Sequence, residues 1–319
     1  LDLPELAQFE GLVRLAGDHE GYLEQVRLAL AEADDDSLLA SRQAFAARQT
    51  WLHRAEALDD ALSSISEPLI SIVVLTYNNL DYTKQCLHSL EVNTDYENVE
   101  IIVVDNASSD DSPAYLAEWE QGAANRRFIA NQSNLGFSAG NNVGLDVARG
   151  DYLVVLNNDT YVTPGWLRTL RNQLRRRADA GLVGPVTNNI GNEAKIQISY
   201  ESMEQMVELA GRYTRANAGR SFEIATSAFF CVMISRQAYT VVGGLDEQFG
   251  VGFFEDDDYC RRLEQAGLVR LCAEDVFVHH HLSASFNKLK AEAKQALFEK
   301  NKALYEAKWG KWSPHGYRS

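Results

Sequence analysis

The sequence predicts an α/β fold, a mostly parallel sheet flanked by helices, with a helical extension in front of it. Three observations lead to this prediction. From residue 68 onward, short apolar runs of strand length alternate with amphipathic segments of helical period, the pattern of parallel βαβ units. Polar residues stand directly after several of these runs, where α/β proteins bind ligands. Residues 1–66 hold no convincing strand, and their apolar residues recur at helical spacing.

Two amphipathic helices are expected in the extension, residues 1–66. The first is marked by five apolar residues: Leu12, Leu15, Leu23, Val26 and Leu30. The acidic run Asp34–Ser37 breaks the pattern and offers an N-cap for a second helix from about Leu38 to Leu62. Because amphipathic helices need a partner surface, we expect an attachment or linker here, either the end of an upstream domain or a dimerisation arm.

Four strands and two helices are expected between residues 68 and 160. The strands are Ser71–Tyr77, Val99–Asp105, Arg127–Ala130 and Asp151–Leu156, and the helices are Asp81–Val92 and Ser138–Ala148. The continuous apolar runs are typical of strands buried on both faces. Ligands bind beyond the carboxyl ends of such strands. The polar residues at those ends are therefore the first candidates for function: Thr76, Asn78, Asp105, Asn157 and Asp159.

The second half is predicted to be mixed. A helix starts near Pro164, and a further helix starts at the acidic run after Phe254. Apolar runs predict four more strands: Leu182–Val186, Ala228–Ser235, Leu268–Cys272 and Val276–His280.

Composition excludes several classes of protein. The chain has 319 residues and a formal charge of −15, and so acidic a surface repels the phosphate backbone of nucleic acid. The longest apolar stretch, Ala228–Ile234, is far too short to span a bilayer. Four unpaired cysteines in apolar or helical contexts are expected to be reduced and buried: Cys86, Cys231, Cys260 and Cys272. These features predict a cytoplasmic protein, either free or peripheral at the inner face of the membrane.

A hydrophobic strand runs straight into Asn157, Asn158 and Asp159. An aspartate at such a strand end can hold a hard divalent cation that bridges two phosphates of a nucleotide. The alternative is a capped turn before the next helix. A second candidate centre is the acidic run Glu255–Asp258. Acids at a helix N-terminus favour the macrodipole by about 0.3–1 kcal/mol each, but four in a row exceed what capping requires.

Six motifs occur in a fixed order along the chain. They are Ser71–Asn78, Asp105–Asp110, Asn134–Gly144, Gly150–Asp159, Gly243–Phe249 and Phe253–Arg262. Together they resemble the inverting family 2 glycosyltransferases of GT-A fold, which is Rossmann-like. The resemblance covers about residues 68–310. It implies a nucleotide-binding half at 67–160, followed by an acceptor-binding half and C-terminal helices at 161–319.

The resemblance also implies roles for single residues on the donor side. Thr76, Tyr77 and Asn78 would border the nucleotide base, and Asp105 would accept from the ring N–H of that base. The alternative role for Asp105 is a cap. Asn142 would lie beside the diphosphate and ribose, with Asn157 and Asn158 also on the nucleotide. Asp159 matches the metal-binding last position of the family's Asp-x-Asp motif. Asn157 replaces aspartate at its first position, which predicts weaker metal retention.

On the acceptor side, the resemblance places the general base at Asp256, with Glu255 beside it. His280 is the best match for a histidine that completes the metal shell or touches the diphosphate. Since successive side chains of a strand face opposite ways, His279 and His281 should share the other face.

The function implied is inverting, metal-dependent transfer of a sugar from a nucleotide diphosphate to a hydroxyl of a glycan or lipid-linked glycan. The cation would be Mn²⁺ or Mg²⁺, and the donor a UDP-hexose, a UDP-N-acetylhexosamine or dTDP-rhamnose. Soluble members of the family commonly build bacterial surface polysaccharides. The Gln-x-x-Arg-Trp motif of processive synthases is missing, so addition of one or a few sugars is expected. The rival interpretation is a non-catalytic nucleotide-sugar or glycan-binding module in a multi-domain assembly protein.

Overall fold

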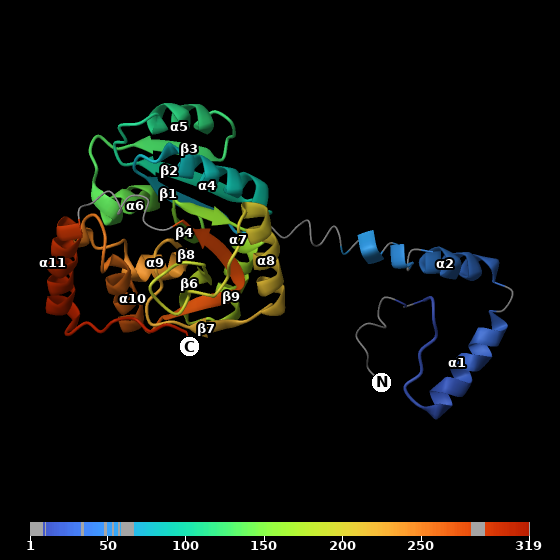
Figure 1. The fold of residues 1–319 in the computed structure, drawn as a ribbon. Coiled ribbons are helices and arrows are strands. Elements are labelled where there is room, and N and C mark those ends of the chain that lie inside the picture. The colour runs from blue at the N-terminus through green and yellow to red at the C-terminus, as the bar shows by residue number, and fades with distance from the viewer. Residues whose placement is uncertain are drawn as a thin grey trace. The chain divides into compact units, whose positions relative to one another are not determined.

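The computed structural model describes residues 9, 11–32, 35–47, 50–52, 54–56, 58, 67–281 and 291–318. The chain divides into two compact units, Leu1–Ser66 and Glu67–Ser319 (Figure 1). The first unit contains α1 (His19–Ala31) and α2 (Asp36–Ala47). Neither helix has a buried residue.

The helix predicted over Leu38–Leu62 is not continuous. Helix α2 ends at Ala47, and Thr50 starts a new turn in which its carbonyl accepts from the Arg54 N–H at 3.1 Å. Residues 59–62 of that prediction lie outside the described residues.

The second unit is built on one sheet with strand order β3-β2-β1-β4-β8-β6-β9-β5, and β7 pairs with β9. Its first four strands are β1 (Ile70–Thr76), β2 (Val99–Asp105), β3 (Arg126–Ala130) and β4 (Tyr152–Asn157). They are parallel to one another, as predicted. Thr76 pairs with Asp105, and Leu75 with Asn157, so the carboxyl ends of three strands meet at one edge.

The other half of the sheet is mixed. It contains β5 (Thr160–Val162), β6 (Ala180–Val186), β7 (Ser221–Glu223), β8 (Cys231–Ser235) and β9 (Val269–His280). Strand β8 runs antiparallel to both β4 and β6, whereas β9 is parallel to β6. The two strands predicted at 268–272 and 276–280 are a single strand, β9. The polar residues between them form an irregularity, where the register slips from Pro185 opposite Ala273 to Val186 opposite Phe277.

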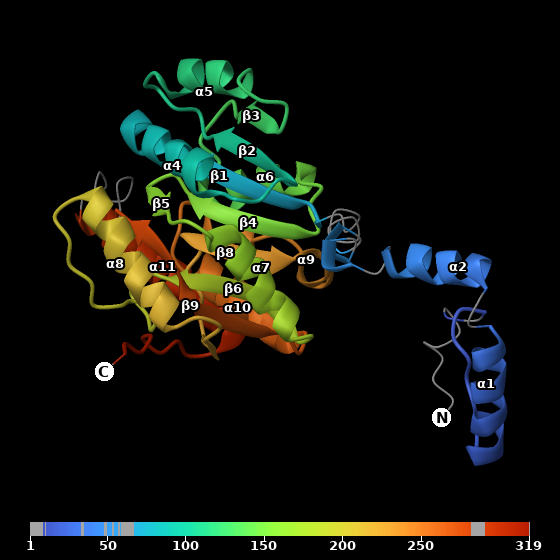
Figure 2. The same cartoon turned by 90° about the vertical axis from the view of Figure 1, so that its right-hand side faces the viewer.

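Helices cover both faces of this sheet (Figure 2). The helices of this unit are α4 (Leu80–Asn93), α5 (Ser112–Glu120), α6 (Gly136–Val147), α7 (Trp166–Arg176), α8 (Met203–Ala216), α9 (Arg236–Val242), α10 (Glu255–Gln265) and α11 (Ala291–Trp309), with a 3₁₀ turn at Glu247–Phe249. Helices α4, α5 and α7 pack in one core cluster with Ile72 and Val74 of β1. Helices α6, α9 and α10 pack in the other with Val73, because successive strand residues face opposite sides.

All four cysteines are free and buried, as predicted. Within the described residues, no helix is long and apolar enough to cross a membrane.

Helix α6 lies so close to β1 that a side chain at Gly144 has no room. A Cβ atom there would stand 2.4 Å from Val73 Cγ1 and 3.1 Å from Val104 Cγ2. We predict that Gly144→Val lowers the free energy of unfolding by about 2 kcal/mol or more through overpacking, because helix propensity differs little between the two residues. Urea denaturation measures this. Gly191→Val, at an exposed loop position, is the control and should stay within about 0.5 kcal/mol. Equal stability of the two variants would contradict the close packing.

Candidate active site

The buried end of β2 is tied to the end of β1 through one serine. Asp105 is 1% exposed, and its carboxylate accepts from the Ser108 N–H at 2.9 Å and from the Ser108 hydroxyl. The Ser108 Oγ accepts in turn from the Asn78 N–H at 2.7 Å. Asp105 therefore closes a turn at the end of β2, and the same bonds fix the loop after β1.

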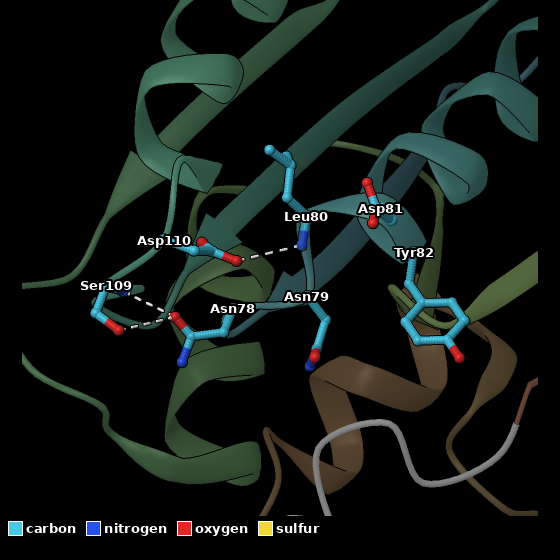
Figure 3. Close-up of a pocket in the computed structure, with 7 residues that line it drawn as sticks. All are labelled: Asn78, Asn79, Leu80, Asp81, Tyr82, Ser109 and Asp110. Carbon is cyan, nitrogen blue, oxygen red and sulfur yellow. Dashed lines mark hydrogen bonds between the residues drawn. The ribbon is translucent and has the colours of Figure 1, made fainter.

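That loop borders a pocket of about 510 Å³ (Figure 3). The pocket is lined by Asn78, Asn79, Leu80, Asp81, Tyr82, Ser109 and Asp110. Asn78 and Asn79 both have positive φ, 56° and 61°, a conformation that asparagine tolerates better than most residues. The Asn78 Oδ1 accepts from the Ser109 N–H at 2.8 Å, and Asp110 accepts from the Leu80 N–H at 3.3 Å. The loops after β1 and β2 are thus joined at two points, and Asn78, Asn79 and Tyr82 extend from the same side (Figure 3).

Three residues that were predicted to bind the nucleotide form hydrogen bonds within the protein through their side chains. Thr76 is buried, and its hydroxyl bonds to the Thr83 hydroxyl at 2.8 Å. The Asn158 amide donates to both hydroxyls, at 3.1 and 3.0 Å. The Asn142 amide donates to Leu245 O and to Glu247 Oε1, each at 2.9 Å, and its oxygen accepts from the Leu245 N–H. These internal hydrogen bonds support the candidate site, and Asn142 holds the loop at 243–247 in place.

Asp159 and His280 lie close together just beyond the carboxyl end of β4. His280 Nε2 lies 3.4 Å from Asp159 Oδ1, and both residues are buried. His280 is clamped: its ring stacks on Phe230 with centroids 4.9 Å apart, and its Nδ1 lies 3.2 Å from the carbonyl oxygen of Asn189. Because that carbonyl only accepts, Nδ1 carries a proton, and Nε2 is the ring nitrogen that faces Asp159.

An imidazole nitrogen and a carboxylate oxygen at this spacing suit a divalent cation that accepts mixed N and O donors. No third His, Cys, Asp or Glu joins them to complete a ligand cluster within the described residues. Such an ion would therefore take its remaining ligands from water or substrate, as Mg²⁺ and Mn²⁺ do in phosphate sites.

The flanking histidines contact each other, as the strand alternation predicted. His279 Nε2 lies 3.2 Å from His281 Nδ1, and the His281 ring contacts the Tyr82 ring at a centroid distance of 5.0 Å. Burial, with His281 next to it, lowers the pKa of His279 to about 4, so this imidazole is neutral. Tyr82 links the pocket of Figure 3 to the strand that carries His280.

The acidic first turn of α10 divides into two pairs. Asp258 is fully buried and bonds to Arg262 Nε at 2.8 Å, Lys308 Nζ at 2.5 Å and Trp309 Nε1 at 2.8 Å. Asp257 bonds to His315 Nε2 at 2.7 Å and to the Thr226 hydroxyl at 3.2 Å. These two carboxylates are neutralised by the protein.

The other pair, Glu255 and Asp256, forms no ion pair within the described part of the chain. Glu255 Oε2 is buried without a hydrogen-bond partner among the described residues, and Asp256 Oδ1 accepts from the Asp257 N–H at 2.9 Å. Burial, and next the negative charge of Asp257, raises the pKa of Asp256 to about 7. Burial, and next the charge of Asp256, raises the pKa of Glu255 well above its usual range. Asp256 is partly exposed, so a proton acceptor that titrates near neutrality is presented at this turn.

One short segment connects the acidic turn with the Asp159–His280 pair. Thr226 bonds to Asp257, Phe230 stacks on His280, and the Phe230 carbonyl accepts from the Asn157 N–H at 2.8 Å. Residues 226–230 therefore connect the two centres.

Sequence reasoning missed several residues of this site. Ser108 had a signal, since an Asp three residues before a Ser is turn chemistry. His315 had none, because it lies 58 residues from its partner Asp257. Asn301 was missed for the same reason: its buried amide donates to the carbonyls of Phe249 and Gly252, each at 2.7 Å, in the loop before α10.

The family model described as "Glycosyl transferase family 2" matches residues 71–243, more than half of the chain. An uncharacterized protein, y4gI of Sinorhizobium fredii, is 27% identical over 257 residues, which are 76% of this chain and 28% of that protein. The glycosyltransferase GlyG of Streptococcus pneumoniae is 34% identical over 116 residues, 36% of this chain and 38% of GlyG. The chain spans well under two thirds of the length of these relatives.

Solved structures show the same fold. The mannosyltransferase PcManGT of Pyrobaculum calidifontis, in complex with GDP-Man and Mn²⁺, matches with a TM-score of 0.55 at 16% identity over 79% of this chain and 66% of that chain. S. aureus TarS with UDP-GlcNAc matches with a TM-score of 0.53 at 15% identity over 75% of this chain and 66% of that chain. These neighbours show that the chain contains the predicted GT-A fold.

The acidic turn predicts opposite effects of two similar substitutions on stability. Asp256→Asn should raise the free energy of unfolding at pH 8 by about 1 kcal/mol or more, since one pKa unit corresponds to about 1.4 kcal/mol. The unfolded carboxyl titrates near pH 4 and the folded one near 7. Ionisation therefore costs stability as the pH rises through this window, and the cost is complete above it. At pH 4 the variant should match the wild type.

Asp257→Asn is the matched control. It should destabilise the protein at pH 8, because it removes the partner of His315 and Thr226. Chemical denaturation at both pH values measures these changes. An Asp256→Asn protein no more stable than wild type at pH 8 would contradict the unpaired state of this carboxylate.

Proposed function

The chain belongs to glycosyltransferase family 2, and we propose that it transfers a sugar, with inversion, from a nucleotide diphosphate to a hydroxyl of a glycan acceptor. The observation that carries this proposal is Asp256, a partly exposed carboxylate that has no ion-pair partner within the described residues, in a turn that residues 226–230 connect to the Asp159–His280 pair. Transfer to a hydroxyl requires a group that accepts its proton as the oxygen attacks the anomeric carbon. Glu255 lies beside Asp256, and burial, followed by the charge of Asp256, raises its pKa well above the usual range, which favours its protonated form.

The nucleotide is proposed to bind at the loops after β1 and β2. Tyr77 and Asn78 follow directly after β1. Asp105, which is hydrogen-bonded to Ser108, would accept a hydrogen bond from the ring N–H of the base. A uracil ring offers such an N–H, and the TarS neighbour was solved with UDP-GlcNAc, which favours a UDP-sugar; dTDP-rhamnose remains the second choice. The donor half, residues 67–160, would be supported by the internal hydrogen bonds of Thr76, Asn142 and Asn158.

Asp159 and His280 would hold a divalent cation, Mn²⁺ or Mg²⁺, and Asn157 stands next to them at the end of β4. Two structural neighbours, PcManGT and GalNAc-T7, were solved with Mn²⁺. When bound, such an ion offsets the charge that develops on the leaving diphosphate. His280 would contribute its Nε2, because the Asn189 carbonyl holds a proton on Nδ1.

The acceptor is proposed to be a hydroxyl of a glycan or lipid-linked glycan in the synthesis of a bacterial surface polysaccharide. Residues 161–319 would bind it, since Asp256 lies in this half. The relatives named above include the glycosyltransferase GlyG, and a putative glycosyltransferase, EpsH of Bacillus subtilis, is 34% identical over 99 residues, 31% of this chain and 28% of EpsH. We place the reaction in the cytoplasm, free or at the inner face of the membrane, with residues 1–66 joining this domain to another part of the polypeptide or to a second copy.

Donor binding is tested by calorimetric titration with UDP, dTDP and GDP, each with Mn²⁺ and with a chelator. UDP should bind with Mn²⁺ at least about tenfold more tightly than with chelator. Asp159→Asn should remove that difference, because it leaves His280 without its anionic partner. Asp146→Asn, an exposed position on α6, is the control and should bind like wild type. Equal affinities with and without metal in the wild type would count against the metal site.

The base is tested by UDP release from a panel of UDP-sugars with glycan acceptors. Asp256→Asn should lower kcat by about 10²–10⁴-fold while leaving the affinity for UDP within about twofold. In the wild type, kcat/KM should fall about tenfold per pH unit below pH 7, since the base must be ionised and its folded pKa is about 7. Undiminished turnover in Asp256→Asn would refute the assignment, and binding without turnover in the wild type would favour a non-catalytic module.

A further inference from the structure

The C-terminal tail, residues 310–318, crosses the N-terminus of α10. The Trp312 ring packs on Phe254, the residue just before the acidic turn, with centroids 5.3 Å apart. Three residues later, His315 reaches Asp257 inside the turn. Arg318 then fixes the end of the tail, with Nη1 2.7 Å from Glu274 Oε1 and Nε 2.5 Å from the Glu193 carbonyl. His315 is therefore held on both sides by anchored neighbours.

His315 differs from the other cations near the acidic turn in which carboxylate it pairs with. Asp258 has Arg262 and Lys308, whereas His315 is the only Lys, Arg or His in the described residues that forms an ion pair with Glu255, Asp256 or Asp257. The other charged or titratable groups around this cluster are Glu193, Cys260, Arg261, Arg270 and Tyr305. Without His315, only the Thr226 hydroxyl would offset the charge of the Asp257 side chain.

We propose that His315 is a positioning residue for the base: it neutralises and holds Asp257, and so leaves Asp256 as the carboxylate that receives the acceptor proton. The inference rests on the proposed role of Asp256. Asp257 and Asp256 are adjacent, and the Asp257 N–H is the bond that holds the Asp256 carboxylate, so a displaced Asp257 disturbs both the charge and the orientation of its neighbour. The hydrogen bond from His315 to Asp257 raises the pKa of the His315 imidazole, which favours its charged form.

The test is a ¹³C NMR titration of the Asp256 carboxyl in the full chain, assigned with Asp256→Asn. His315→Gln keeps a hydrogen-bond donor but loses the charge, and it should raise the midpoint of Asp256 by roughly half to one pH unit. His88→Gln, the same substitution at an exposed position of α4, should leave the midpoint unchanged. A midpoint that His315→Gln does not move would overturn the proposal.

Two further measurements separate charge from a merely structural anchor. In the double variant Asp257→Asn with His315→Gln, the Asp256 midpoint should return to the wild-type value or below, because the charge that His315 offsets is gone. In the wild type, the His315 imidazole should titrate above its ordinary range, and in Asp257→Asn it should return toward that range. A wild-type imidazole that titrates at or below the ordinary range would overturn the proposal even if His315→Gln does not fold.

Turnover then distinguishes this inference from the proposed function. With an active donor, His315→Gln should lower kcat/KM about three- to tenfold at pH 6 and leave it near the wild-type value at pH 9. The titrations need no substrate. Full turnover of Asp256→Asn would remove the base assignment but leave the measured coupling of His315, Asp257 and Asp256 in place. An unmoved midpoint would remove the positioning role and leave the base assignment intact.

Discussion

The crowding of four consecutive carboxylates in the first turn of α10, three of them buried and Asp256 partly exposed, is the constraint on which the rest of the site depends. Charges of one sign at that density cannot all remain ionised in a protein interior, so each must be paired, protonated or left to titrate near neutrality. The chain resolves this by pairing two of the carboxylates: Asp258 with Arg262 from the same helix and Lys308 from α11, and Asp257 with His315 from the tail. Within the described residues, Glu255 and Asp256 are left without an ion-pair partner, and the proposed function makes Asp256 the proton acceptor.

The donor side is organised by a different principle, in which backbone loops are tied by short polar side chains. Asp105, Ser108 and Asn78 join the ends of two parallel strands, and buried hydroxyl and amide groups support them from below. Two pairs of neighbouring residues have positive φ: Asn78 and Asn79 directly before α4, and Phe253 and Phe254 directly before α10. Such strained pairs persist only where surrounding contacts hold them, and here they aim the helix starts that line the site.

Sequence reasoning recovered what is local and periodic. The buried runs of β1, β2 and β4, the edge where their polar ends meet, and the shared face of His279 and His281 all follow from spacing along the chain. It could not decide between roles that depend on distant partners. Asn142 and Asn158 have the residue type of ligand contacts, yet the structure uses them as internal supports for segments that approach only after folding. The division of the four acids depends on Lys308 and His315, about 50 and 60 residues away in sequence, and no local pattern carries that information.

The most direct test of this account is a crystal structure of the chain with Mn²⁺ and a non-hydrolysable UDP-sugar. The account predicts the cation on Asp159 and His280, the base ring against Asp105, and the Asp256 carboxylate on the face of the anomeric carbon opposite the diphosphate. A metal bound elsewhere, or an Asp256 carboxylate turned away from the sugar while Asp257 or Glu255 faces it, would contradict the central claim.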